Sequence, residues 1–145
     1  MASSFAQKPP VWLYIAGIVL LLWGLAGCWA FYMHVTLGAA ANPQATDWDR
    51  AYYAALPSWF AIDFAVAVGA GALGSIALLL RSKWAVTLYW ISLIAVVIQF
   101  GYMFLATDVI AVKGALATLF PAFVFAIALF EVWFSGMATK RGWLR

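Results

Sequence analysis

The stretch that decides the fold is residues 11–35, which reads VWLYIAGIVLLLWGLAGCWAFYMHV. It contains no Asp, Glu, Lys or Arg, and its one histidine is His34. A helix crosses the hydrocarbon core of a bilayer with about 20 mostly apolar residues, because each residue adds about 1.5 Å of length. Residues 11–35 therefore predict a membrane-spanning helix. Pro9 and Pro10 precede it, and proline is tolerated where a helix begins.

This apolar run is too long for the hydrophobic part of a signal peptide, which measures about 7–15 residues. Lys8 precedes the run and the small residues Ala39 to Ala41 follow it, as they do in a cleaved signal. The length of the run favours a helix that is retained in the membrane.

Three more stretches have the length and composition of spans, at 58–80, 84–106 and 114–137. Ser58 follows Pro57 and is a candidate N-cap of the second. Pro121 lies inside the fourth stretch, where it predicts a kink because proline removes a backbone hydrogen bond. The long connection 38–57 contains an aromatic and charged segment, residues 46–53, that suits a short helix at the membrane interface.

Composition supports the same conclusion. Of the 145 residues, 68% are hydrophobic and 9% are charged, whereas soluble domains have about 45–50% and about 25%. These values exclude a soluble enzyme and a disordered chain, and the single cysteine, Cys28, excludes a disulfide scaffold. We therefore predict an all-α membrane protein, a four-transmembrane-helix bundle that forms one domain over residues 1–145.

The charges predict an orientation. With four spans, both termini lie on the same side as the 81–83 turn. That side carries six of the eight cations, Lys8, Arg81, Lys83, Lys140, Arg141 and Arg145, and the other side carries Asp47, Asp49, Arg50, Asp108 and Lys113. The positive-inside rule then predicts that both termini are cytoplasmic.

Polar side chains in spans are rare and face the bundle interior or a cavity. If the first two helices form an antiparallel hairpin, His34 and Asp63 lie at similar depth, near Asp108 at the outer side. A His–Asp pair would titrate near physiological pH, so these three residues form a candidate proton site. The alternative is a structural ion pair for Asp63 and an interfacial role for His34.

Glu131 lies in the inner third of the fourth stretch, at a level comparable to Arg81 and Lys83. An ion pair with one of these two cations would stabilise its costly carboxylate. The alternative is a carboxylate that couples transport. Gln99 and Tyr102 share a helix face and are interpreted as packing contacts.

Small residues recur at helical spacing on two of the spans. They are Gly17, Gly24 and Gly27 on the first, and Ala67, Ala70, Gly74 and Ala77 on the second. Spacings of three and four place each set on one helix face. Small residues let helices approach closely in membranes, so both sets predict helix packing.

Residue counts also argue against most kinds of reaction centre. One His and one Cys make a zinc site unlikely to form, and no catalytic residues or cofactor are predicted. We expect bound lipid, and we expect no nucleic-acid partner because there is no basic patch with interleaved aromatics.

The chain resembles a group of small four-span bacterial inner-membrane proteins that are often loosely labelled "sugar transporter". The resemblance rests on Lys8–Tyr14, on the helix end from Gly74 to Arg81, and on the closing residues Arg141–Arg145. It implies a protein of the inner membrane of a Gram-negative bacterium.

The function that we expect from the sequence is that of a non-catalytic accessory or assembly protein. Scarce polar groups and small-residue stripes favour packing on a larger membrane complex, on other transmembrane subunits, or on copies of itself as a homo-oligomer. The main alternative is a small oligomeric transporter, proton-coupled and acting on sugar or another small solute, through His34, Asp63 and Glu131. A third interpretation is a lipid-active enzyme with residues 44–57 as its lid.

Overall fold

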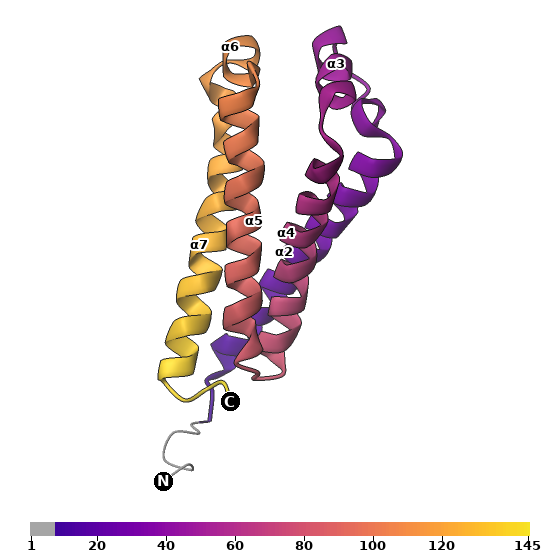
Figure 1. Ribbon diagram of the computed structural model, residues 1–145. Coiled ribbons are helices and arrows are strands. Elements are labelled where there is room, and N and C mark those ends of the chain that lie inside the picture. Colours follow the sequence, from indigo (N-terminus) through magenta and orange to yellow (C-terminus); the bar gives the residue numbers. More distant parts are fainter. Residues whose placement is uncertain (1–7) are drawn as a thin grey trace.

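A computed structural model describes residues 8–145 of the chain, without the side chains of Leu116 and Ala117. The described part is all-helical (Figure 1). Its α-helices are α2 (Val11–Thr36), α3 (Asp47–Ala55), α4 (Ser58–Leu79), α5 (Trp84–Ala106), α6 (Val109–Lys113) and α7 (Leu119–Lys140), and two short 3-10 helices cover Gly38–Ala41 and Ala115–Thr118. Four of the helices, α2, α4, α5 and α7, are long and apolar enough to cross a membrane. The predicted fold class, a four-helix membrane bundle, is confirmed.

The first three spanning helices, α2, α4 and α5, begin at the predicted residues and end within one residue of the predicted position. The fourth differs, because α7 begins at Leu119 and not at 114. Gly114 has a φ of +83° and ends α6, and a 3-10 helix then leads into α7. Pro121 therefore lies in the first turn of α7, where backbone N–H groups have no partner within the helix. The reason for the predicted kink thus falls away.

The bundle has two ends. Figure 1 shows the start of α2, the α4–α5 turn and the end of α7 together at one end, here called the terminal end, and α3 and α6 at the other, here called the loop end. Within the bundle α4 packs against α2 and α5, and α5 packs against α7. Residues 1–7, which the orientation prediction includes, lie outside the described part of the chain.

The glycines of α2 lie against α4. A Cβ atom on Gly24 would come within 2.9 Å of the Ala72 Cα atom, and one on Gly27 within 2.9 Å of Val68 Cγ1. On Gly17 it would meet the side chain of Leu79. The three glycines that the spacing placed on one face thus lie where α2 approaches α4 most closely.

The small residues of α4 face α5. Ala67, Ala70 and Ala77 are buried, and a Cβ on Gly74 would lie 2.8 Å from the Tyr89 ring. Two hydrogen bonds also join these helices. The Ser92 hydroxyl donates to the Ala67 carbonyl at 2.6 Å, and the hydroxyls of Ser75 and Tyr89 lie 2.7 Å apart. Helix α4 therefore uses one face for α2 and another for α5.

The main hydrophobic core lies at the terminal end. It joins all four long helices and the tail after α7, through Leu13, Leu20, Ala77, Leu78, Ala85, Tyr89, Phe134, Ala138, Trp143 and Leu144. The tail also bonds to the α4–α5 turn: the N–H of Arg145 donates to the Arg81 carbonyl at 2.8 Å, and Arg81 Nε donates to the Trp143 carbonyl at 2.9 Å. These contacts close the terminal end of the bundle.

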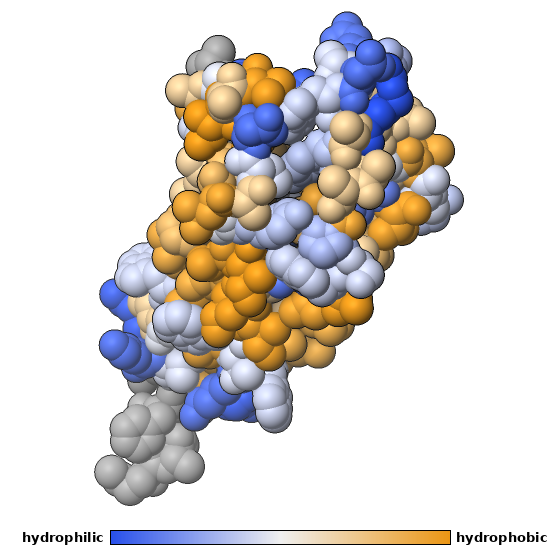
Figure 2. All heavy atoms as spheres, turned by 45° about the horizontal axis from the view of Figure 1, so that its top comes forward, coloured by the Kyte–Doolittle hydropathy of each residue, from blue (hydrophilic) through white to orange (hydrophobic). Residues whose placement is uncertain are grey.

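The surface has the pattern of a membrane protein. Figure 2 shows hydrophilic residues gathered toward the two ends of the molecule, with a broad hydrophobic band between them. Large apolar side chains of the long helices are well exposed, among them Ile62, Trp84 and Leu119. Their exposure is favourable against lipid and unfavourable against water.

Candidate functional site: a cavity between the helices

A cavity of about 500 Å³ lies between the four long helices. It reaches from Gly38 and Tyr53 at the loop end to Glu131 in the middle of α7. Its volume falls within the range of about 300–1,000 Å³ that is typical of sites for small molecules. A second, smaller cluster of buried side chains is formed by Ala67, Ala95 and Val96, of which Ala67 and Val96 line the cavity. The bundle is thus packed at the terminal end and hollow toward the loop end.

The floor of the cavity is polar. Glu131 and Ser92 are each 4% exposed there, and Gln99, further along α5 toward the loop end, is 9% exposed. Glu131 lies nine residues before the end of α7 and Ser92 eight residues after the start of α5. At 1.5 Å per residue, both lie about 12–14 Å from the terminal end. The helices therefore bring a carboxyl group and a hydroxyl group to one depth in an otherwise apolar cavity.

Glu131 has an unsatisfied oxygen. Its Oε2 atom is buried and has no hydrogen-bond partner in the described part of the chain. Native proteins give most buried polar side-chain atoms a partner, so an exception needs an explanation. In hydrocarbon an unpartnered carboxyl group is costly, and such groups mark ion, proton or substrate pathways.

The predicted ion pair of Glu131 with Arg81 or Lys83 is not formed. The ion pairs among the described residues are Asp47–Arg50 and Asp49–Lys113. Arg81 turns toward the tail, where its Nε atom bonds to the Trp143 carbonyl. Glu131 lines the cavity, whereas Arg81 contacts the tail at the terminal end, so the two side chains lie in different parts of the bundle.

The predicted cluster of His34, Asp63 and Asp108 is not assembled either. No hydrogen bond or ion pair joins these three residues to one another in the described structure. The His34 ring lines the cavity and packs on the rings of Phe60 and Phe64, with centroids 5.7 Å and 5.2 Å away. The reason is that aromatic side chains of α4, and not its carboxylate, occupy the space against His34.

Asp63 has a buried Oδ2 atom without a hydrogen-bond partner among the described residues, and it does not line the cavity. Asp108 lies at the loop end, where its Oδ1 atom accepts a hydrogen bond from Trp48 Nε1 at 3.0 Å. The sequence placed both residues at the right end of the bundle. It did not predict that Phe60 and Phe64 would pack against His34.

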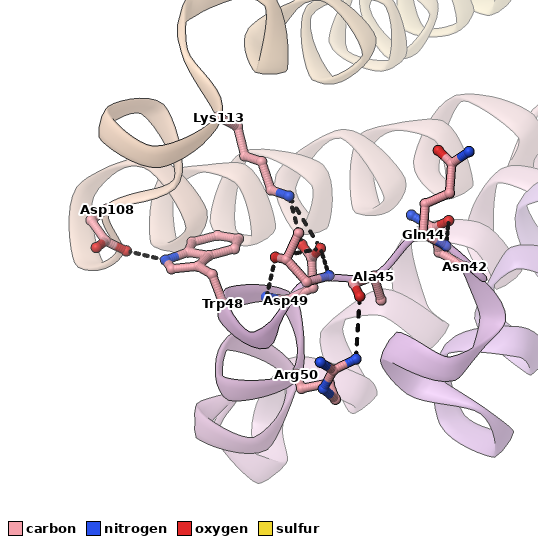
Figure 3. A network of polar contacts seen from close by, with 9 residues as sticks. Asn42, Gln44, Ala45, Trp48, Asp49, Arg50, Asp108 and Lys113 are labelled. Atoms are coloured by element: carbon pink, nitrogen blue, oxygen red, sulfur yellow. Dashed lines mark hydrogen bonds and ion pairs between the residues drawn. The ribbon is translucent and has the colours of Figure 1, made fainter.

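The loop end carries a polar contact between α3 and α6, here called the α3–α6 clamp, formed by Trp48, Asp49, Asp108 and Lys113 (Figure 3). Lys113 Nζ lies 3.0 Å from Asp49 Oδ1, and it also lies over the Trp48 ring, 5.4 Å from the centroid. Because α3 precedes α4 and α6 follows α5, the clamp connects the two halves of the bundle where the cavity makes their packing loosest.

Helix α3 is held in place for this contact by a capping box. Thr46 Oγ1 accepts a hydrogen bond from the Asp49 N–H, and Asp49 Oδ2 accepts one from the Thr46 N–H. The Thr46 N–H, and then Lys113, hold the pKa of Asp49 below its usual range. Asp49 therefore stays charged and serves both the helix start and the clamp.

A second hollow lies between α3 and the end of α5, and its lining includes Tyr52, Tyr102 and Asp108. Burial raises the pKa of Tyr52 to about 12, with the nearby Tyr53 and Tyr102 adding to the effect. The Tyr52 hydroxyl thus keeps its proton, and it has no hydrogen-bond partner within the described part of the chain.

Neither the clamp nor the cavity was predicted from the sequence. The signals for the clamp were the Thr-x-x-Asp pattern at 46–49 and the opposite charges of Asp49 and Lys113 on one side of the membrane. No comparable signal marks the cavity, because it is lined by ordinary small and aromatic residues.

Comparison of the chain with protein-family models, with curated proteins and with solved structures gave no match. The geometry of the site is therefore what guides a functional interpretation. It offers an apolar cavity within a membrane, with a carboxyl group at its floor of which one oxygen has no partner among the described residues.

Proposed function

We propose that the protein is a small membrane carrier that binds a largely apolar solute in the cavity, with the carboxyl group of Glu131 as its polar contact. The observation that carries this proposal is the Glu131 side chain, which is 4% exposed, has an unpartnered oxygen and lines the cavity. A buried carboxyl group must bind a proton or another charged or donating group to avoid a large desolvation cost. A ligand in the cavity supplies such a group.

The lining favours an apolar solute over the sugar that the resemblance implies. Sugars need several convergent hydrogen-bonding groups. The described lining offers a few polar side chains spread over its length, chiefly Ser92 and Glu131 at the floor, Gln99 further along α5, and His34 and Tyr53 toward the loop end. The remaining wall consists mostly of small, aliphatic and aromatic residues, which gain free energy by covering apolar ligand surface.

Photolabelling tests whether the cavity takes up a solute. A short-chain alcohol that carries a diazirine group is added to the purified protein in nanodiscs, and labelled peptides are identified by mass spectrometry. We expect labels on the segments around Gly71 and Ser92, which face the cavity, at saturable concentrations of the alcohol.

A filled cavity provides the matched comparison. Val124→Trp places a large side chain into the cavity, whereas Leu129→Trp adds the same side chain on the exposed face of α7, where Leu129 is 46% exposed. Labelling should fall in Val124→Trp and persist in Leu129→Trp. Equal labelling in the two variants would show that the alcohol enters from lipid without using the cavity, and the proposed function would be wrong.

The proposal includes an inner-membrane location with the terminal end in the cytoplasm. Its support is the charge distribution, because Arg81, Lys83, Arg141 and Arg145 lie at the terminal end and Asp47, Asp49 and Asp108 at the loop end. A green fluorescent protein fused after Arg145 should fluoresce, and alkaline phosphatase at the same position should be inactive. The reverse pattern would contradict this orientation.

An accessory role is a second candidate, supported by one surface feature. Trp29 and Tyr32 on α2 stack at 5.5 Å between ring centroids and are 63% and 54% exposed. Such a pair suits contact with another transmembrane subunit or with a second copy of the chain. Purification in mild detergent should then recover a partner that is lost in the double variant Trp29→Ala, Tyr32→Ala. A single-sized monomer in both preparations would leave only the carrier.

A further inference from the structure

The charge of the cavity is uncompensated. Among the described residues that line it, Glu131 is the one acidic residue, and none is Lys or Arg. The titratable group near Glu131 is Tyr89 on α5, whose hydroxyl is hydrogen-bonded to Ser75 of α4. His34 also lines the cavity, but at its far end. The part of α2 that lines the cavity contributes Trp23 and one titratable residue, His34, and none of its described residues there is Asp, Glu, Lys or Arg. Among the described lining residues, no Lys or Arg side chain balances an ionised Glu131.

The walls select against a metal ion. Calcium and magnesium ions take about six or more oxygen ligands, and a zinc site needs three or four His, Cys or carboxylate ligands. The described part of the chain contains no cluster of three His, Cys, Asp or Glu residues that would hold a metal. An organic cation suits this site better, because a charge spread over a large organic group needs few oxygen ligands.

Aromatic rings line the path between the loop end and the floor. They include Trp23, Phe64, Phe100 and Phe120. Aromatic faces attract organic cations through the negative charge of the ring face, in addition to covering apolar surface. The site thus combines one negative group with a wall that favours both parts of a lipophilic cation.

A single carboxylate also fixes the charge of the ligand. In a low-dielectric site a charge is tolerated when it is paired, and an unpaired one is strongly unfavourable. A monocation neutralises Glu131, whereas a dication leaves a positive charge and an anion adds a negative one. A volume of about 500 Å³ fits a single drug-sized molecule.

The geometry points to a lipophilic organic monocation as the ligand of the cavity, seated against Glu131 in exchange for a proton. This inference rests on the proposed function and specifies its solute. In the exchange, the neutral carboxyl group releases its proton to water as the cation binds, so that a neutral site becomes a neutral ion pair. The total charge inside the membrane is the same before and after.

The experiment uses tetraphenylphosphonium, a lipophilic monocation, with the full-length protein in nanodiscs. Isothermal titration calorimetry in two buffers of different ionisation enthalpy measures both the affinity and the protons released. We expect one ligand per chain, release of up to one proton, and an affinity that weakens as the pH falls, approaching tenfold per pH unit where the carboxyl group is protonated.

Three variants separate the role of Glu131 from that of the fold. Glu131→Gln should weaken cation binding at least tenfold and abolish proton release, while labelling of the cavity by the neutral diazirine alcohol persists. Glu131→Asp should retain proton release. Asp63→Asn is the matched control, because Asp63 is another acid within a span and does not line the cavity, and it should bind the cation like the wild type.

The outcomes are distinguishable. If the neutral alcohol labels the cavity but tetraphenylphosphonium does not bind, or binds Glu131→Gln as well as the wild type, the inference is overturned and the proposed function stands. If neither probe enters the cavity, both fail. If Glu131→Gln does not fold, the wild-type titration decides: binding without pH dependence and without proton release overturns the inference, and binding with both supports it.

Discussion

Lys113 Nζ lies 3.0 Å from Asp49 Oδ1, which ties α6 to α3 across 64 positions of the sequence. Both side chains are partly exposed, at 35% and 18%. Ion pairs of this kind contribute about 0.2–1 kcal/mol because water screens them. We therefore predict that a double-mutant cycle of Asp49→Asn and Lys113→Met gives a coupling free energy in this range, measured by thermal unfolding in detergent.

A matched pair of charges shows whether the coupling is specific. Asp47 and Arg50 also form an ion pair, but both belong to α3, so breaking it leaves α6 untouched. The corresponding Asp47→Asn variant should not change the distance between α3 and α6. A coupling free energy near zero for Asp49 and Lys113 would show that the pair does not hold the helices together.

Acidification should open the α3–α6 clamp. The pKa of Asp49 is lower in the folded protein than in the unfolded chain, where it is about 3.9. Such a group stabilises the fold at pH values above the unfolded pKa, and this contribution disappears as the pH falls through the lower, folded pKa. The clamp is then intact from pH 7 to about pH 5 and weakens below about pH 4.

Spin labels measure this opening. With Cys28 replaced by serine, Ala51→Cys and Val112→Cys place labels on exposed positions of α3 and α6. The distance between the labels should broaden or lengthen below about pH 4, and Asp49→Asn should show the longer distance already at pH 7. An acid transition of unchanged size in Asp49→Asn would assign the opening to another group.

Gly24 should tolerate no side chain. The Cβ of an alanine at this position would lie 2.9 Å from the Ala72 Cα atom, which belongs to the α4 backbone and has little room to move. Overpacking of this kind costs about 1–3 kcal/mol, so Gly24→Ala should lower the unfolding temperature in detergent.

Gly69 provides the comparison, because a Cβ there would meet nothing within 4 Å. Gly69→Ala should leave stability unchanged or raise it by up to about 1 kcal/mol, since alanine favours helix more than glycine does. A Gly24→Ala variant as stable as Gly69→Ala would mean that α2 and α4 are not in contact at this point.

Removing the Tyr89 hydroxyl should have a modest effect. This hydroxyl lies 2.7 Å from Ser75 Oγ, and Ser75 also donates to the Gly71 carbonyl at 3.1 Å. Tyr89→Phe therefore leaves Ser75 with a partner, and we expect a loss of about 0.5–1.5 kcal/mol in a chemical or thermal unfolding measurement. Tyr89→Ala, which also empties core space beside Gly74, should cost about 3–5 kcal/mol. Equal losses for the two variants would contradict this division.

The sequence was sufficient to predict the helices. Runs of more than 20 apolar residues have one favourable structure in a membrane, in which each backbone group bonds within its own helix. The start of α4 at Ser58 and of α5 at Trp84 followed from their prolines, charges and turns alone. The start of α7 was wrong by five residues, because Gly114 ends one helix without its left-handed φ being visible in the hydropathy.

The candidate site was harder to predict, because depth in the membrane does not specify which way a helix faces. His34 and Asp63 do lie toward the loop end of neighbouring helices, yet Phe60 and Phe64 hold the position against His34 that was assigned to Asp63. For Glu131 the expected level of the cation was wrong, because Glu131 lies about 12–14 Å from the terminal end whereas Arg81 lies in the turn at that end and bonds to the tail. A difference of one residue turns a helical side chain by about 100°, which decides such contacts.

The attachment of the tail to the α4–α5 turn has a mechanical consequence. Arg145 is bonded to Arg81 at the terminal end, so a rotation of the α5–α7 half about that contact would move the loop end farthest. A helix of 22 residues makes a lever arm of about 33 Å, so a swing of about 5° displaces its far tip by about 3 Å. The Asp49–Lys113 contact lies at that far tip, where the smallest force resists a rotation because it acts at the longest distance from the pivot. The weak Asp49–Lys113 ion pair therefore opposes separation of α3 and α6 more effectively than the same pair would nearer the terminal end.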